Sequence, residues 1–136
     1  MKIMLDENAR MPVRAHEYDA GLDLFSREDA YIRANNSFVF DTGVHVEIPK
    51  CCVGFIKSRS GTMVRHNLVT DGTIDCGYTG SLRVKIFNLG DTDYEVKAGD
   101  KIAQLVIVPC VMPTLELVDS LEETDRGSAG FGSTGR

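Results

Sequence analysis

The chain has 136 residues, of which 43% are hydrophobic and 26% are charged, and its formal net charge at pH 7 is −5. This length corresponds to one domain with a sizeable core, and the acidic balance argues against a general affinity for nucleic acid or for an anionic membrane surface. No apolar run approaches the ~20 residues that a membrane-spanning helix needs.

The N-terminus and the cysteines point to the same compartment. The segment from Met1 to Glu7 lacks the apolar core of a signal peptide, so we expect an intracellular, cytoplasmic protein. The cysteines and histidines are not spaced as zinc ligands usually are. They are Cys51, Cys52, Cys76, Cys110, His16, His45 and His66. We expect four free thiols, as is usual in a reducing compartment.

Short segments in which apolar and polar residues alternate follow one another along the chain, and this alternation predicts half-buried strands. The predicted strands are residues 3–5, 19–26, 30–33, 37–40, 44–48, 53–57, 73–75, 81–88, 94–96, 101–108 and 114–118. The only helical turn predicted is residues 63–67. Many short strands with almost no helix indicate an all-β barrel or jelly roll.

Three polar residues within these strands have two interpretations each. Asp23 either faces solvent or is buried with a partner, because an unpartnered buried acid is costly. Gln104 interrupts an otherwise apolar strand and is either a satisfied core amide or a ligand contact. His45 is expected to be a solvated sheet residue rather than a catalyst.

The two-sided apolar character of 101–108 suggests burial against another subunit.

The segment Ser58 to Thr62 has the composition of an anion site. The run Ser60-Gly61-Thr62 can turn successive N–H groups inward, and Arg59 adds a bidentate phosphate donor. A plain helix N-cap is the alternative interpretation of the same residues.

The stretch of residues 71–80 contains three glycines, two acids and one tyrosine. We predict that residues 73–75 pair with 81–88 as a β-hairpin, whose tip presents Asp75 on one side and the ring of Tyr78 on the other. The glycines allow a ligand to approach closely. The alternative is a surface turn in which Asp75 is only a turn residue.

The chain divides by composition into a domain, residues 1–124, and a glycine- and serine-rich arm, residues 125–136. Such a composition is flexible, and a loose terminus is common. One aromatic residue and two arginines lie among the hydroxyls and glycines of the arm. That composition suits an arm that becomes ordered over an aromatic, phosphorylated ligand.

Five segments, taken in order, resemble the motifs of the homotrimeric dUTP pyrophosphatase (dUTPase) family. They read AGLDLFS (20–26), RSG (59–61), GTIDCGYTG (72–80), GDKIAQL (99–105) and RGSAGFGSTG (126–135). The resemblance spans nearly the whole chain, and the third and fifth segments are the most specific. It implies a jelly-roll-like, β-clip-like homotrimer with three active sites between subunits.

The resemblance also implies an activity, which is hydrolysis of dUTP to dUMP and pyrophosphate with Mg²⁺. That reaction lowers dUTP and supplies dUMP for thymidylate synthesis. Asp75 would orient and activate the attacking water, and Tyr78 would pack under the deoxyribose and exclude a 2′-hydroxyl. The backbone of the hairpin, including Gly72 and Ile74, would hydrogen-bond uracil.

The remaining site residues are assigned by the same resemblance to the phosphates and to the arm. They are Arg59, Ser60, Gly61, Gln104, Arg126, Phe131, Gly132, Ser133 and Thr134. Phe131 would stack on the uracil ring. Asp23 would support the metal region through water or a neighbouring arginine, with Mg²⁺ held mainly by the substrate phosphates.

One residue departs from the family pattern, one acid has no assigned role, and three other functions remain open. Ser58 stands where the family usually has proline, a change that can loosen the phosphate loop without removing a phosphate ligand. Asp71 is an uncommon acid with no assigned role. The alternatives are a dCTP deaminase of the same fold, a non-catalytic trimeric regulator that binds dUTP or a protein, and a jelly-roll structural protein. The arm argues against the deaminase, and the complete set of acids and arginines argues against the regulator.

Overall fold

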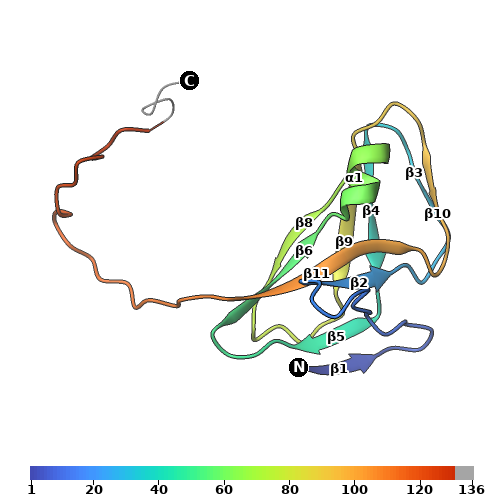
Figure 1. Cartoon of the computed structure of the whole chain (residues 1–136), viewed down its shortest axis with the longest axis horizontal. Coiled ribbons are helices and arrows are strands. Elements are labelled where there is room, and N and C mark those ends of the chain that lie inside the picture. The colour runs from blue at the N-terminus through green and yellow to red at the C-terminus, as the bar shows by residue number, and fades with distance from the viewer. Residues whose placement is uncertain (131–136) are drawn as a thin grey trace.

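The computed structural model describes residues 1–130 and consists almost entirely of β-strands (Figure 1). The strands are β1 Lys2–Leu5, β2 Gly21–Phe25, β3 Ala30–Ile32, β4 Asn36–Asp41, β5 Val44–Glu47, β6 Cys52–Lys57, β7 Leu68–Val69, β8 Asp71–Ile74, β9 Arg83–Asn88, β10 Tyr94–Val96 and β11 Lys101–Pro109. The one helix in the described residues is α1, Ser60–His66. No helix in residues 1–130 has the length and apolar character that crossing a membrane requires.

The strands pair antiparallel in sheets of different sizes. A four-stranded sheet has the order β2-β11-β6-β8, a three-stranded sheet has the order β4-β9-β7, and two further pairs are β1-β5 and β10-β3. The pairings do not close into a barrel within the described residues. The expected all-β, jelly-roll-like fold is therefore confirmed, in an open form.

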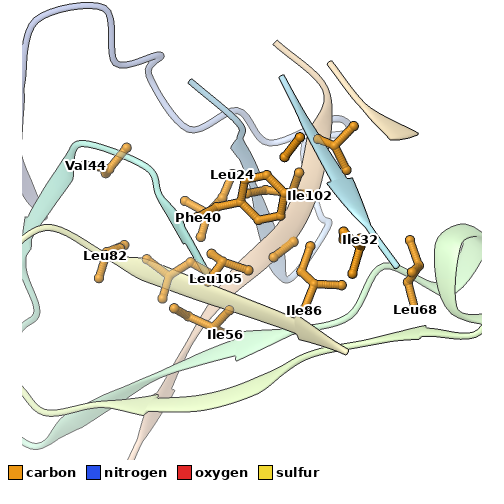
Figure 2. Close-up of a cluster of buried hydrophobic side chains, with 14 of the residues drawn as sticks. Leu24, Ile32, Phe40, Val44, Ile56, Leu68, Leu82, Ile86, Ile102 and Leu105 are labelled. Carbon is orange, nitrogen blue, oxygen red and sulfur yellow. The ribbon is translucent and has the colours of Figure 1, made fainter. Parts of the chain in front are cut away.

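One hydrophobic core lies between the sheets (Figure 2). Strand β9 shows how the sequence builds it, because its residues alternate between exposed and buried, with Val84 and Ile86 pointing inward. Leu24, Phe40 and Leu105 have no exposed surface. Fully burying one such side chain contributes about 1.5–3 kcal/mol relative to leaving it in water.

The predicted hairpin of residues 73–75 with 81–88 is wrong. Strand β8 pairs with β6 in the four-stranded sheet, whereas β9 pairs with β4 and β7 in the three-stranded sheet. The segment between β8 and β9, residues 75–82, is therefore a loop that passes from one sheet to the other. We call it the Tyr78 loop.

The predicted strand at residues 114–118 is also wrong. The chain after β11 runs away from the sheets without pairing (Figure 1). Its large apolar side chains are exposed, with Leu115 at 92% and Leu117 at 100%. A strand needs a neighbour for its backbone hydrogen bonds, and the described part of the single chain offers none here.

Candidate active site

Residues Ser58 to Gly61 follow the end of β6, and the helix begins earlier than predicted. Helix α1 starts at Ser60 rather than at residue 63, with Arg59 as its N-cap residue and no side-chain capping bond. The hydroxyl of Thr62 instead donates to the carbonyl of Arg59 at 3.0 Å. The first backbone N–H groups of a helix have no partner within it, so those of Ser60 and Gly61 are available to an anion.

Asp23 is buried between two cations. Its side chain is 12% exposed; Arg59 Nε donates to one carboxylate oxygen at 3.1 Å, and Lys101 Nζ lies 2.7 Å from the other. An isolated β-bridge to Val13 fixes the backbone of Asp23. The buried interpretation of Asp23 is therefore the correct one, and its neighbouring arginine is Arg59.

The side chain of Gln104 supports the segment that follows β6. Its Nε2 donates to the carbonyl of Ser58 at 3.0 Å, and its strand position faces Asp23 on β2 and Lys57 on β6. A Cβ added at Gly21 would lie 2.0 Å from Gln104 Oε1. A larger residue at that position would therefore push the amide out of its present place.

Ser58, which replaces the usual proline, and Asp71, which had no assigned role, both have polar partners. The hydroxyl of Ser58 donates to the carbonyl of Thr70 at 3.1 Å and accepts from the Thr70 N–H at 2.8 Å. These two bonds tie the segment after β6 to Thr70, between β7 and β8, which argues against the loosening expected from the loss of proline. Asp71 lies opposite Lys57 and pairs with it, and this ammonium holds the pKa of Asp71 below its ordinary value.

A first cavity, of about 370 Å³, lies between β2, β11 and the start of α1, and we call it the anion cavity. Its lining includes Asp23, Arg59, Ser60, Gly61, Lys101 and Gln104. The mixture of cationic side chains and helix amides suits a phosphate chain. Lys101 was missed as a site residue, because a lysine at the start of an apolar strand looks like an ordinary strand end.

A second cavity, of about 240 Å³, lies beside the Tyr78 loop and is lined by Thr73, Ile74, Asp75, Tyr78 and Arg83. We call it the Asp75 cavity. The N–H of Tyr78 donates to the carbonyl of Asp75 at 3.0 Å. Arg83 was missed as a site residue, since it occupies the polar face of a regular strand.

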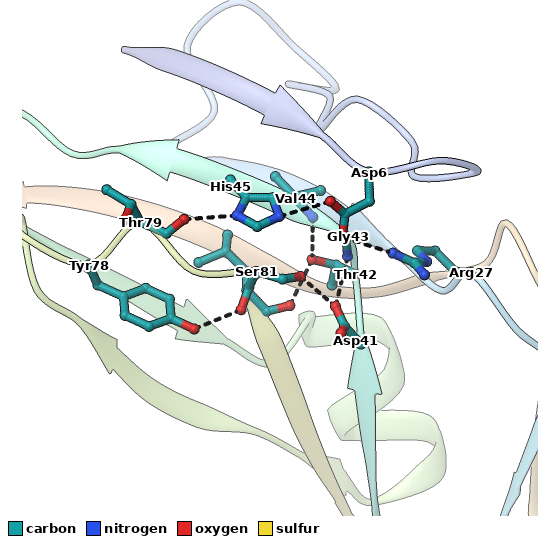
Figure 3. Close-up of polar contacts among 11 residues, drawn as sticks. Asp6, Arg27, Asp41, Thr42, Gly43, Val44, His45, Tyr78, Thr79 and Ser81 are labelled. Atoms are coloured by element: carbon teal, nitrogen blue, oxygen red, sulfur yellow. Dashed lines mark hydrogen bonds and ion pairs between the residues drawn. The ribbon is translucent and has the colours of Figure 1, made fainter.

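The ring of Tyr78 folds back over Gly80. Its hydroxyl donates to the carbonyl of Ser81 at 3.0 Å (Figure 3). A Cβ added at Gly80 would lie 2.4 Å from that hydroxyl oxygen. The glycine therefore sets where the ring can lie, and Tyr78 remains 43% exposed, with surface available to a ligand.

The two cavities lie toward opposite ends of β6. At one end, Lys57 pairs with Asp71, and Arg59 of the anion cavity follows two residues later. Toward the other end, Gly54 pairs with Ile74, the residue before Asp75. These two pairs are three residues apart along the strands, a separation of about 10 Å at the usual strand rise. Neither cavity of this chain contains both Arg59 and Asp75.

The arm does not reach either cavity in the described residues. Arg126 is exposed, and its Nε donates to the carbonyl of Ala129 at 3.3 Å, within the arm itself. Phe131, Gly132, Ser133 and Thr134 lie outside the described residues, so the assignments made for them stay predictions.

The described residues offer few groups that could bind a magnesium ion directly. No cluster of three or more His, Cys, Asp or Glu side chains suitable for a metal occurs within residues 1–130. Both oxygens of Asp23 already contact cations. The environment of Asp23 therefore fits a water-mediated contact to an ion that the phosphates carry.

Comparisons with known proteins agree on the family. A family model described as dUTPase matches residues 7–135. A deoxyuridine 5'-triphosphate nucleotidohydrolase of Clostridium tetani is 41% identical, covering 98% of this chain and 94% of the relative. That of Mus musculus is 42% identical, covering 98% and 83%.

Solved structures give the same result. The Staphylococcus bacteriophage 80alpha dUTPase with dUPNHPP has a TM-score of 0.93 at 36% identity, covering 99% of this chain and 98% of that one. A variant of the dUTPase from phage phi11 of S. aureus, solved to describe the coordination of a structural Mg(II) ion, has a TM-score of 0.83 at 36% identity, covering 90% and 98%. The chain belongs to the dUTPase family.

Proposed function

We propose that the protein hydrolyses dUTP to dUMP and pyrophosphate, in active sites that combine the anion cavity of one subunit with the Asp75 cavity of another. One observation carries the proposal. The chain has both a cationic cavity around Arg59, which suits phosphates, and a separate cavity that contains an acid and an aromatic ring. Relatives named deoxyuridine 5'-triphosphate nucleotidohydrolase support the substrate.

The chemical step is assigned to Asp75. Water is a poor nucleophile, so a carboxylate within hydrogen-bond reach must accept its proton as it attacks the α-phosphorus. Pyrophosphate then leaves, and the task of the protein is mainly to position the groups in line. Arg59 and Arg126 offset the charge that develops on the phosphates.

Magnesium is the expected cofactor. When bound to the triphosphate, the ion supplies positive charge that stabilises the transition state. The chain would hold it mainly through the substrate, with Asp23 nearby as a water-mediated contact. Asp23 also contacts both Arg59 and Lys101, and these contacts help to place the two cations.

The nucleoside is assigned to the Asp75 cavity. Backbone groups around Gly72 and Ile74 would hydrogen-bond the polar edge of uracil, and cytosine would leave some of those groups unpaired. The ring of Tyr78 would pack under the deoxyribose, so that a 2′-hydroxyl clashes. Phe131 would stack on the base, while Gly132, Ser133 and Thr134 would close over the phosphates with Arg126.

A homotrimer with shared sites is proposed because the anion cavity and the Asp75 cavity lie apart in one chain. One dUTP molecule needs its phosphates bound and its α-phosphorus beside the activated water at the same time. A neighbouring subunit can supply the missing half of each site. In the cell, the reaction would lower dUTP and supply dUMP for thymidylate synthesis.

The proposal is tested with dUTP, dTTP, dCTP and UTP in the presence of Mg²⁺. We expect pyrophosphate and dUMP from dUTP, little turnover of the other nucleotides, and loss of activity with EDTA. Orthophosphate as the first product would contradict attack at the α-phosphorus. Ammonia from dCTP would instead identify a deaminase, and binding without turnover would identify a regulator.

Replacing Gly80 by alanine is expected to weaken the selection of deoxyribose. The new Cβ would displace the ring of Tyr78, so the ratio of kcat/KM for dUTP to that for UTP should fall by at least about tenfold. Tyr78→Ala should have the same effect.

The matched control is Gly77→Ala in the same loop, where a Cβ meets nothing within 4 Å. Its ratio should stay near that of the wild type. An unchanged ratio in Gly80→Ala and Tyr78→Ala would mean that another residue selects the sugar.

A further inference from the structure

His45 makes an unexpected pair of contacts with the Tyr78 loop and the N-terminal turn (Figure 3). Its Nδ1 lies 2.8 Å from the carbonyl oxygen of Thr79, and its Nε2 lies 3.1 Å from Asp6 Oδ1. Its side chain is only 17% exposed. The ring is therefore half-buried between the loop and the turn, and is not as freely solvated as the sequence suggested.

Both partners of His45 are hydrogen-bond acceptors. A carbonyl oxygen and an ionised carboxylate accept but do not donate, so each ring nitrogen must carry a proton to make its bond. A neutral imidazole has one N–H and can keep only one of the two bonds. The full arrangement therefore requires the doubly protonated ring.

The carbonyl that His45 holds belongs to the residue next to Tyr78. Thr79 lies between Tyr78 and Gly80, at the point where the ring folds back. The end of the loop is secured separately, since the N–H of Leu82 donates to the carbonyl of Val44 at 2.8 Å. His45 thus contacts the part of the loop that positions the ring.

We propose that doubly protonated His45 is a positioning residue that holds the Tyr78 loop in the arrangement that binds the nucleotide, so that recognition of deoxyuridine weakens as His45 loses a proton. This inference rests on the proposed function, because it uses Tyr78 as the wall of the sugar site. It assigns no contact between His45 and the substrate.

Charged groups around His45 favour its protonated form. Asp6 lies on the turn after β1 and Asp41 at the end of β4, and both carboxylates favour a cation. Arg27, on the turn after β2, opposes this in part because its Nη1 lies 3.3 Å from Asp6 Oδ2. On the paired strands β1 and β5, Lys2 and Glu47 bind each other at 2.9 Å, so their charges largely offset.

The direction of the pH effect follows from these contacts. The hydrogen bond to the Thr79 carbonyl, followed by the bond and charge of Asp6, raises the pKa of His45 above its ordinary value of 6.5. The protonated ring is then fully present below 6.5 and is lost as the pH rises through the raised pKa. The loop should be held at pH values below the raised pKa and released as the pH rises through it.

The test measures kcat and KM for dUTP and UTP between about pH 6 and pH 9. In the wild type, the KM for dUTP should rise by at least about threefold through one titration midpoint, while kcat changes less. Proton NMR of the three histidines should give the same midpoint for His45. His45→Gln identifies its signal and should remove the midpoint from the KM profile.

Two further variants separate positioning from a general effect on the fold. Asp6→Asn removes one charged partner and should move the KM midpoint and the His45 pKa together to lower pH. His66→Gln is the matched control, because that ring packs against Tyr94, with 4.9 Å between the ring centroids, and does not contact the loop. The substrate also ionises with pH, but it does so equally for all variants. A difference between their pH profiles therefore comes from the protein.

Binding of dUMP tests the inference without turnover. If the held loop binds the nucleotide better, dUMP must raise the pKa of His45 by linkage. A protein that hydrolyses dUTP but shows no such rise, with the same KM profile in His45→Gln, overturns this inference alone. A protein that shows the rise with dUMP but releases no pyrophosphate overturns the proposed function instead.

Discussion

Asp75→Asn is expected to lower kcat for dUTP by at least ~10²-fold, the low end for losing a general base. The asparagine amide has almost the same shape as the carboxylate but cannot take a proton from water. Binding of a non-hydrolysable dUTP analogue should stay within about tenfold, since the volume and most polar contacts of the Asp75 cavity remain. Steady-state kinetics and titration calorimetry measure the two quantities.

The control for this variant is Asp119→Asn, which makes the same chemical change at an exposed position after β11. It should leave kcat and KM unchanged. Near-normal turnover by Asp75→Asn would rule out the proposed role of that carboxylate.

The same variant also tests whether the active sites are shared. Arg59→Ala should be inactive for a different reason, because it removes a phosphate donor and leaves Asp23 with one cation. Mixed trimers of Asp75→Asn and Arg59→Ala should then regain activity, since some sites combine the intact half of each subunit. No recovery in a mixture shown to contain mixed trimers would mean that both residues come from one chain.

Deleting residues 126–136 is expected to remove most of kcat while leaving the fold intact. The arm up to residue 130 is exposed, so its removal should leave the melting temperature nearly unchanged. The truncated protein should still bind dUMP weakly, because the anion and Asp75 cavities do not include the arm. Thermal unfolding and turnover measured on the same sample separate the two effects.

The arm is expected to act as a transient lid because the free energy that its ordering costs is similar to the free energy that its contacts with substrate supply. Ordering the glycine-rich arm costs roughly 1 kcal/mol or more for each backbone residue fixed. Stacking of Phe131 on uracil can supply about 1–3 kcal/mol, and Arg126 with the hydroxyls of Ser133 and Thr134 adds charge-assisted bonds to the phosphates. The arm should therefore close only transiently, excluding water and completing the positive charge around the phosphates.

Closure can be observed directly with Phe131→Trp, because the chain has no other tryptophan. Adding a dUTP analogue with Mg²⁺ should change its fluorescence. Full activity in the truncated protein would mean that the arm is only a tail.

The faces of the strands were predictable from the sequence, but the partners of the strands were not. Val84 and Ile86 alternate with Arg83 and Lys85, and this period of two reports which side chains are buried. It does not report which neighbour satisfies the backbone. Residues that are close in sequence often pair, but the segment 71–74 pairs with β6 instead.

The candidate site was predictable in composition and only partly in geometry. The sequence shows that burying the acid at position 23 would be costly without a partner. It does not identify Lys101 as the second partner, because the two residues meet only through the pairing of β2 with β11. The covering of His45 likewise depends on Asp6 and Thr79, which come from separate parts of the chain. Contacts between such distant parts of the chain can be identified only once the fold is known.

The Tyr78 loop starts in one sheet and ends in another, so its geometry depends on the hydrophobic side chains between the two sheets. The separation of the two ends depends on the volume of the side chains packed between the sheets, among them Ile56, Leu82 and Leu105 (Figure 2). Close-packed interiors register changes as small as one methylene. Conservative hydrophobic replacements there can thus alter the catalytic rate of related sequences even where every polar site residue is identical.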